Sequence, residues 1–543
     1  MTLKPLRARD AIITLLALVA CVPILARTSL NSPRTRAEAT GFRETSRYSD
    51  VVAFIDSLRD RPLTFGSIGR TNEGREIPYI IASYPQVSTP EEARALKRPI
   101  VYVQANIHAG EVEGKEALLA LVRDLSAAPR PGVLDSIVLI AVPIYNADGN
   151  ERFASQSVNR SAQDGPELVG VRQNAQGLDL NRDYIKAEAP ETRASLAMFN
   201  AWDPDVFVDL HTTDGSYHRY ALTYAPPLHP SAPLGAYTRD SLLPILQSRM
   251  KARHSFETFD YGDFISEDTL SKGWATFDSR PRFGTNYYGL RGRISFLSEA
   301  FSHDPFEKRI ASTYAFTREI LSLVAERAVS ILARNSAATQ MGVSVAGRPP
   351  VALQSQMAAA PKLRPIAAEF LEKTGDTLRS APGVRRGYRR SGRFQTVSMP
   401  VFDRFEPTLL QEAPSGYLIS PSDTALVRML QLHGITVESN FKVRRGRLLT
   451  FVLDSARREP RVFQRHNERR IFGRWVQKAF SEMNIPAGLF YVSTHQPRGL
   501  LVQYLLEPMS DDGFATWNFF DSQLKPGAVF SVSRVELIYN GIN

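Results

Sequence analysis

Apolar residues in the N-terminal part of the chain follow two alternating patterns. Apolar runs at residues 100–103, 138–142 and 206–210, the last interrupted only by Asp209, are typical of strands buried on both faces of a sheet. Residues 51–58 and 115–125 instead carry apolar side chains at the spacing of an amphipathic helix. Strands that alternate with helices predict an α/β domain with a mixed, largely parallel sheet flanked by helices. In such sheets, ligands bind at the carboxyl ends of the strands.

The pattern changes further along the chain. Residues 334–362 are rich in Ala, Ser and Gln, and the short β-like runs that follow predict a β-rich α+β domain. A chain of 543 residues is longer than one hydrophobic core usually organises, so two domains are expected. We therefore predict a linker at 27–44, a first domain at 45–333, a linker at 334–362 and an accessory domain at 363–543.

The first 26 residues have the pattern of an export signal. Lys4, Arg7 and Arg9 precede an apolar run at residues 11–20 that is too short to span a bilayer. We therefore predict that residues 1–26 are a signal peptide. The protein is expected in the periplasm, outside the cell or on an outer membrane as a lipoprotein.

Cys21 is the only cysteine of the chain. Residues 18–21 resemble the lipobox of bacterial lipoproteins, which predicts cleavage before Cys21 and membrane anchoring through a lipid on this residue. The alternative is ordinary signal cleavage after Ala26. Because one cysteine cannot form an intrachain disulfide, the fold is expected to depend on its cores.

The formal net charge of +10 is concentrated in the predicted accessory domain. From residue 345 onward, the chain holds about 27 Lys and Arg against about 17 Asp and Glu. The arginine groups at residues 385–393 and 444–474 are expected either to bind an anionic surface or to be plain solvated surface. Nucleic acid is not an expected partner, because export would separate the two.

Two histidines and a glutamate follow predicted buried strands. His108 and Glu111 come directly after the strand at 100–103, and His211 ends the strand at 206–210. Imidazole and carboxylate groups that meet at one sheet edge are zinc ligands, and three of them leave the fourth position of a catalytic site open. Asp209 or Asp214 is placed to fix the tautomer of His211.

A second polar cluster, at residues 172–184, lies between these histidines. The planar guanidinium of Arg182 can bind a carboxylate through two hydrogen bonds, and Asn181 can donate a third. The sequence therefore predicts an anion site, with a solvated loop as the alternative.

These motifs occur in an order that resembles the zinc metallocarboxypeptidases of the carboxypeptidase A type, in particular a secreted bacterial member. Residues 68–75 also resemble the Gly-x-Ser-x-Glu-Gly-Arg stretch that opens many of their catalytic domains. The resemblance covers about residues 45–330 and implies a carboxypeptidase-like fold for them. The motifs that carry it are His108-x-x-Glu111, Asn146-x-Asp148-Gly149, Gly177-Leu178-Asp179-Leu180-Asn181-Arg182 and His211.

The resemblance implies a role for each site residue. One zinc ion per chain would be bound by His108, Glu111 and His211. Other roles would be substrate-carboxylate binding for Asn181 and Arg182, oxyanion stabilisation for Arg172, general base for Glu299, and covering of the substrate carboxylate for Tyr287 or Tyr288.

The function implied is zinc-dependent hydrolysis of C-terminal peptide bonds, with a peptide substrate that has a free C-terminal carboxylate. Zinc activates the attacking water and the glutamate acts as general base. One alternative is an amidohydrolase that uses the same site on N-acyl amino acids or cell-wall peptides. The other is a non-catalytic binding protein with the peptidase fold.

The sequence departs from the family pattern at two positions beside these motifs. Gly110 stands where digestive members carry an arginine, which leaves the outer substrate subsite undefined. Asp183 stands where an asparagine is common and would weaken anion binding if it pointed inward. Arg280 and Arg282 are expected either to select an acidic side chain or to lie in a surface turn.

Overall fold

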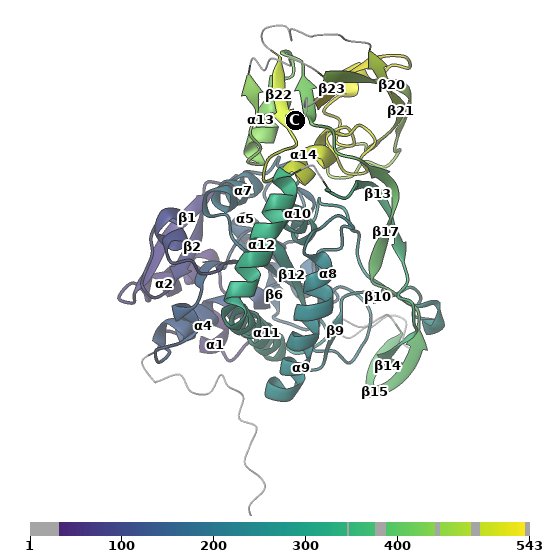
Figure 1. The fold of residues 1–543 in the computed structure, drawn as a ribbon. Coiled ribbons are helices and arrows are strands. Elements are labelled where there is room, and N and C mark those ends of the chain that lie inside the picture. The colour runs from purple at the N-terminus through teal and green to yellow at the C-terminus, as the bar shows by residue number, and fades with distance from the viewer. Residues whose placement is uncertain (1–31, 345–346, 375–386, 440–445, 479–488, 538–543) are drawn as a thin grey trace, which may run out of the picture. The chain divides into compact units, whose positions relative to one another are not determined.

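The computed structural model describes residues 32–344, 347–374, 387–439, 446–478 and 489–537 (Figure 1). Residues 34–543 form one compact unit. The predicted signal peptide, with Cys21 and Ala26, lies outside the described residues, so export and lipid attachment stay predictions. Within the described ranges, no helix is both long enough and apolar enough to cross a membrane.

An eight-stranded mixed sheet organises the N-terminal part, in the order β1-β2-β4-β3-β7-β12-β8-β9. The pairs β4–β3, β3–β7, β7–β12 and β8–β9 are parallel, and the others are antiparallel. The predicted mixed α/β sheet is thus confirmed. Its strands are β1 (Leu63–Arg70), β2 (Glu76–Ala82), β3 (Ile100–Ala105), β4 (Val138–Val142), β7 (Val206–Thr212), β8 (Leu222–Ala225), β9 (Thr258–Asp260) and β12 (Ile294–Ala300).

Successive residues of the central strands enter different hydrophobic clusters, because side chains alternate between the faces of a sheet. Val101 and Val103 of β3 belong to one cluster, whose helices are α2 (Tyr48–Asp56), α4 (Glu113–Ala127), α9 (Leu243–His254) and α11 (Phe306–Glu326). Tyr102 belongs to the other, with α7 (Pro190–Trp202) and α10 (Gly284–Leu290). Helices therefore cover both faces of the sheet, as the apolar runs predict.

The register of the sheet brings polar residues to one edge. Glu299 in β12 pairs with His211 in β7, and Ala105 at the end of β3 pairs with Leu210. His108 lies three residues after the end of β3, where the chain has left the sheet close to His211. This edge is the carboxyl end of three neighbouring parallel strands, where ligands are expected.

The C-terminal part is rich in strands, as predicted. A six-stranded sheet has the order β19-β22-β18-β23-β20-β21, and two hairpin-like pairs, β13–β17 and β14–β15, precede it. The helices of the C-terminal part are α13 (Thr424–Leu432) and α14 (Gly499–Leu506). The strands are β13 (Val351–Ala358), β14 (Arg364–Lys373), β15 (Tyr388–Met399), β16 (Val401–Phe402), β17 (Arg404–Gln411), β18 (Gly416–Ile419), β19 (Glu438–Ser439), β20 (Gly446–Arg458), β21 (Arg469–Lys478), β22 (Phe490–Ser493) and β23 (Val529–Leu537).

The remaining helices and strands connect the elements described above. The helices are α1 (Arg36–Ala39), α3 (Pro90–Ala95), η2 (Val133–Asp135), α5 (Ala147–Glu151), α6 (Gln156–Asn159), η3 (Leu180–Arg182), α8 (Gly235–Tyr237), η4 (Thr238–Leu242), η5 (Leu270–Lys272), α12 (Ala328–Val343) and η6 (Asp521–Gln523). The strands are β5 (Ala154–Ser155), β6 (Leu168–Val169), β10 (Asp263–Phe264) and β11 (Trp274–Ala275).

One hydrophobic cluster continues from the N-terminal part into the C-terminal part. It contains Tyr287 of α10 together with Leu430 of α13, Leu501 of α14 and Trp517. The segment 334–362, predicted as a linker, contains the end of α12 and all of β13. Alanine and glutamine are good helix formers, which explains why this Ala- and Gln-rich stretch continues a helix.

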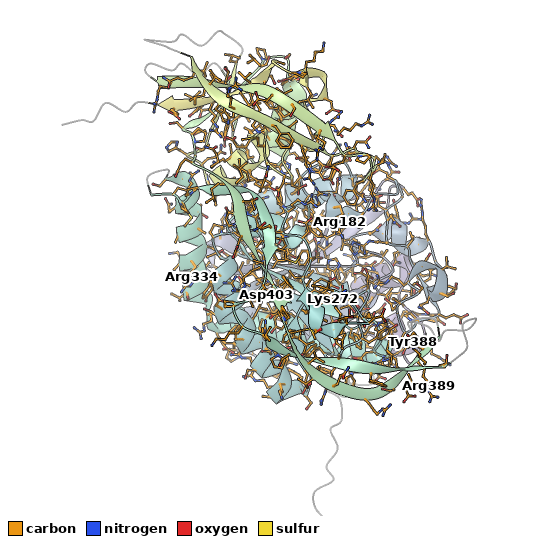
Figure 2. The ribbon with its side chains drawn as sticks, turned by 90° about the vertical axis from the view of Figure 1, so that its right-hand side faces the viewer. Arg182, Lys272, Arg334, Tyr388, Arg389 and Asp403 are labelled. Carbon is orange, nitrogen blue, oxygen red and sulfur yellow. The ribbon has the colours of Figure 1, made fainter. Side chains whose placement is uncertain are left out.

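The arginines of the β14–β15 hairpin are largely paired with acidic side chains. Arg389 and Arg393 contact Glu372, and Arg390 contacts Glu369. Figure 2 shows Tyr388 and Arg389 at one end of this hairpin. Of the predicted basic group at 385–393, the first two residues lie outside the described ranges. Binding of an anionic surface stays a prediction.

Candidate active site

His108, Glu111 and His211 come together at the carboxyl end of the parallel strands. All three are about 3% exposed, and their ligand atoms lie within 4.8 Å of one another. Nδ1 of His108 is 2.9 Å from Oε1 of Glu111, and Nδ1 of His211 is 2.9 Å from Oε2 of the same carboxylate. Two imidazole nitrogens and a carboxylate facing one point suit a zinc ion, which prefers nitrogen and oxygen donors at such short separations.

A turn after β3 orients the side chains of His108 and Glu111. Asn106 has φ +63°, a left-handed conformation that asparagine adopts more readily than most residues. Its side-chain amide donates to the carbonyl of Glu111 at 3.1 Å, and the Glu111 N–H donates to the carbonyl of His108 at 3.0 Å. The chain therefore folds back tightly enough for His108 and Glu111 to face the same point.

Carboxylates hold the far side of both imidazole rings. Nε2 of His108 lies 3.0 Å from Oδ1 of Asp179, and Nε2 of His211 lies 3.0 Å from Oδ2 of Asp209. These contacts leave Nδ1 of each ring to face Glu111, and they fix the orientation that a metal requires. Of the two carboxylates expected near His211, the structure thus places Asp209 behind the ring, whereas Asp214 contacts Arg160.

Asp179 is the most connected of these carboxylates, and the sequence assigned it no role. It lies 6% exposed and also accepts a hydrogen bond from Nε of Arg172 at 2.9 Å. Burial alone would raise the pKa of Asp179, but His108 and Arg182 outweigh burial and hold this pKa well below its usual range. The carboxylate is therefore ionised, and it orients both an imidazole and a guanidinium. Its place two residues before Asn181 is the sequence signal that could have identified it.

A cavity opens beside the three candidate ligands. Glu299 reaches it from β12, where it lies next to His211 and is 8% exposed. Burial raises the pKa of the Glu299 carboxyl well above its usual range; His211 opposes this, and Glu111 and Asp214 add to it. The cavity is lined by His108, Glu111, Arg172, Asn181, Arg182, His211, Thr212, Asp214, Tyr261, Phe277, Phe283, Thr285, Leu297 and Glu299.

The cationic wall of the cavity carries the predicted anion site. The guanidinium of Arg182, labelled in Figure 2, lies 4.0 Å from the ring centre of Phe283, and its Nη1 donates to the carbonyl of Asn181 at 2.8 Å. The side-chain oxygen of Asn181 accepts from the Gly284 N–H at 2.9 Å, so its amide group points in a fixed direction. Asp183 is fully buried and pairs with Lys186 at 2.9 Å. It lines no part of the cavity above and therefore does not oppose anion binding there.

Tyr287 and Tyr288 do not reach the cavity. Both are fully buried; the hydroxyl of Tyr287 lies 2.7 Å from Nδ1 of His433, and Tyr288 stacks on Phe199 with ring centres 3.8 Å apart. They belong to the hydrophobic core because α10 turns them towards the sheet. The tyrosine that lines the cavity is Tyr261, which directly follows β9 and lies much further from Glu299 in the sequence.

Arg280 and Arg282 are held by carboxylates rather than presented to the cavity. Nη2 of Arg282 lies 2.7 Å from Asp512, and its Nη1 lies 2.7 Å from Glu468. Arg280 contacts Asp278 and, at 3.3 Å, Glu468. Both acidic partners of Arg282 belong to the C-terminal part of the chain. These arginines therefore anchor the loop before Phe283 and do not line the pocket described above.

A tight turn of the C-terminal part contacts the segment that carries Asp179. Gln464 and Arg465 both have positive φ, +49° and +66°, and Phe463 and His466 on either side exchange backbone hydrogen bonds. The side-chain oxygen of Gln464 accepts from the Asp179 N–H at 2.8 Å. Non-glycine residues in this conformation cost about 1 kcal/mol or more each, so surrounding contacts must stabilise the turn. No sequence pattern predicts this contact.

Comparison with known proteins identifies the segment that carries most of this site. Residues 51–240 match the family model described as zinc carboxypeptidase. The chain is 22% identical over 487 residues to carboxypeptidase 2 of Trichophyton tonsurans, covering 86% of this chain and 82% of that protein. It is 32% identical over 124 residues to human carboxypeptidase Z, covering 22% of this chain and 18% of that protein.

The solved structures to which the chain is similar include carboxypeptidases. A metallo-carboxypeptidase from Burkholderia cenocepacia is 20% identical with a TM-score of 0.39, covering 52% of this chain and 70% of that one. Carboxypeptidase A from Helicoverpa armigera is 17% identical with a TM-score of 0.38, covering 57% and 77%. The family match ends before Tyr261 and Glu299, so these two residues are placed at the site by the structure.

Proposed function

Since residues 51–240 match the zinc carboxypeptidase family model, we propose that this metallocarboxypeptidase releases C-terminal amino acids from peptides with a free α-carboxylate, and that Glu299 is its general base. One observation carries the proposal. Three candidate metal ligands, an isolated carboxylate and a guanidinium with an amide line a single cavity. Each is a group that peptide hydrolysis at a chain end requires.

The family implies zinc, and the donor set fits it. His108, Glu111 and His211 would hold the ion, with Asp179 and Asp209 orienting the two imidazoles from behind. A bound zinc supplies Lewis acidity and lowers the pKa of a coordinated water to about 7. Three protein ligands leave a position open towards the cavity, as a catalytic rather than a structural site requires.

Glu299 lies where it can transfer a proton from the attacking water to the leaving amine. Its carboxylate lines the cavity beside His211, and among the described residues no basic side chain forms a hydrogen bond or ion pair with it. In the proposed reaction it takes a proton from the attacking water and delivers it to the nitrogen of the leaving amine. Its raised pKa, caused mainly by burial, brings it closer to neutrality and makes it a stronger base than an ordinary glutamate.

The cationic wall binds and polarises the substrate. Arg182 and Asn181 would hold the C-terminal carboxylate, and Arg172, which Asp179 keeps in place, would stabilise the oxyanion that forms on the scissile carbonyl. Loss of one such donor costs about 3 to 4 kcal/mol of transition-state stabilisation in other enzymes. Tyr261 takes, in this proposal, the role of the tyrosine that covers the bound carboxylate.

The test uses the protein without residues 1–26, loaded with one equivalent of zinc. Matched peptides that differ only in a free or amidated C-terminus are assayed for release of the last residue. We expect turnover of the free acids and at least about 100-fold lower kcat/KM for the amides, because the amide cannot form the paired contacts with Arg182. No turnover of any peptide by the zinc-loaded protein would overturn the proposal.

The same assay separates the alternatives. N-acyl amino acids and cell-wall peptides with free carboxylates are included as competing substrates. If one of these were hydrolysed much faster than ordinary peptides, the protein would be an amidohydrolase that uses the same site. If peptides bound with the expected carboxylate dependence but were not cleaved, the protein would be a binding protein with this fold.

Gln464→Ala tests whether the C-terminal turn contributes to the site. The variant removes the acceptor for the Asp179 N–H, and a net hydrogen bond of about 1 kcal/mol corresponds to a fall of about fivefold in kcat/KM. Gln477→Ala, at an exposed glutamine of β21, is the control and should retain full kcat/KM. Equal activity of both variants would show that the turn does not support Asp179.

A further inference from the structure

Gly110 leaves a space beside the candidate ligands, and the side chain of Arg160 fills it. A Cβ atom on Gly110 would lie 2.6 Å from Cγ of Arg160 and 2.9 Å from the carbonyl oxygen of Gly170, closer than such atoms approach in folded proteins, and 3.1 Å from Cδ of Arg160. Arg160 directly follows the short helix α6, far from Gly110 in the sequence, and is 7% exposed. A side chain at position 110 and this path of Arg160 therefore exclude one another.

The guanidinium of Arg160 joins the two halves of the candidate metal site. Its Nη1 lies 3.2 Å from Oε1 of Glu111. Its Nη2 donates to the carbonyl oxygens of Thr212 at 3.1 Å and Thr213 at 2.9 Å, the two residues that follow His211. Nη1 also pairs with Asp214 at 2.5 Å. One planar group thus ties the Glu111 carboxylate to the backbone that carries His211.

We propose that Arg160 is a positioning residue for the metal site, and that the absence of a side chain at Gly110 leaves room for it. This inference rests on the proposed function, because it takes zinc as the metal bound at this site. Arg160 is not among the described residues that line the cavity, so it acts through Glu111 and the chain after His211. A rigid fork that holds both would fix the separation of two ligands before the ion arrives.

Two opposing effects make the proposal testable. Arg160 places a positive charge close to Glu111, and removal of that charge by itself would strengthen binding of a cation. Loss of the positioning contacts would weaken binding, by about 10- to 100-fold for groups that orient metal ligands. If the zinc affinity falls when Arg160 is replaced, the positioning effect is therefore the larger one.

The experiment measures the zinc dissociation constant by competition with a chelator, together with thermal unfolding of the zinc-free protein. For Arg160→Met we expect an increase of about 10- to 100-fold in Kd. Arg160→Lys keeps the charge but cannot make the forked contacts, so its Kd should also rise. Gly110→Ala should displace Arg160 and change Kd in the same direction.

Arg123→Met is the matched control. Arg123 is 1% exposed and pairs with Glu38, but it lies on α4 about 15 Å along the helix from Glu113, the first residue of that helix. Its replacement should leave the zinc Kd within about twofold of the original protein. A folded Arg160→Met or Arg160→Lys with unchanged Kd would overturn the inference, as would an equal loss of affinity in Arg123→Met. Zinc binding is measured without substrate, so the effect of the Arg160 variants on the zinc Kd can be determined even if the peptidase assay shows no turnover.

Discussion

Glu299→Gln is expected to lower kcat by about 10³-fold while the protein still binds one zinc ion per chain, since general acid–base catalysis typically contributes 10²- to 10⁴-fold. The amide has nearly the shape of the carboxylate but cannot accept the proton of the attacking water. Glu299 lies beside His211 in the sheet without being one of the three clustered ligands, so the metal site should stay intact. Single-turnover rates and zinc stoichiometry on the same sample check both parts.

Glu326→Gln is the control for this variant. Glu326 ends α11 and pairs with Arg249 at the surface, away from the described cavity. It should keep the original kcat. If Glu299→Gln retained more than about a tenth of the original kcat, the assignment of the general base would be wrong.

The pH profile provides a second measurement on Glu299. A base works only when it is deprotonated, so kcat/KM should rise as pH rises through the pKa of Glu299. Burial raises this pKa well above its usual range, and Glu111 and Asp214 add to the effect although His211 opposes it. The acidic limb should therefore lie above the ordinary glutamate pKa of about 4.3. A limb at about pH 4 would contradict a buried base.

His108→Ala is expected to abolish both zinc binding and activity. The variant removes one of three ligand groups, and it also leaves the buried carboxylate of Asp179 without its partner at Nε2. Binding of a divalent ion by the two remaining ligands should weaken by at least about 100-fold, a larger effect than the loss of a group behind a ligand. Metal analysis after dialysis against a weak chelator measures the stoichiometry directly.

His495→Ala is the matched control for His108→Ala. His495 lies in the C-terminal part, where its Nδ1 is 3.3 Å from the carbonyl of Ser415. It should retain one zinc ion and full turnover. Together, His108→Ala without zinc and Glu299→Gln with zinc would separate metal binding from proton transfer. Retention of stoichiometric zinc by His108→Ala would show that the ion binds elsewhere.

The metal site could be predicted from the sequence because its signals are local. Apolar runs mark β3 and β7 as buried strands, and the polar residues that follow such strands must lie at the sheet edge. His108 and Glu111 alone form a weak motif, and they became candidate ligands only together with His211 and the other motifs of the resemblance. Asn181 and Arg182 could also be predicted, because they belong to a compact polar motif. Glu299 required the family resemblance, because a single glutamate near the end of an apolar strand is not distinctive by itself.

The covering tyrosine was assigned incorrectly, because the signals that place its side chain are not local. Tyr287 and Tyr288 precede Glu299, although at a shorter distance in the sequence than the resemblance implies, and the face that α10 turns towards the sheet buries both of them. Whether an aromatic side chain points into a core or into a cavity depends on the rotation of its helix against its neighbours. Tyr261 lines the cavity because of the path of the chain after β9, which periodicity does not reveal.

Gly110 illustrates the division between sequence and tertiary structure most clearly. The sequence by itself determined the alternating strands and helices, the three candidate ligands and the proposed carboxylate-binding pair, because burial and strand ends are encoded by short stretches of side chains. Only the tertiary structure decided that Arg160 lies over Gly110, that Asp209 supports His211, and that Gln464 reaches Asp179 across 285 residues. Such contacts depend on strand register and on the packing of distant segments, and no local pattern specifies either.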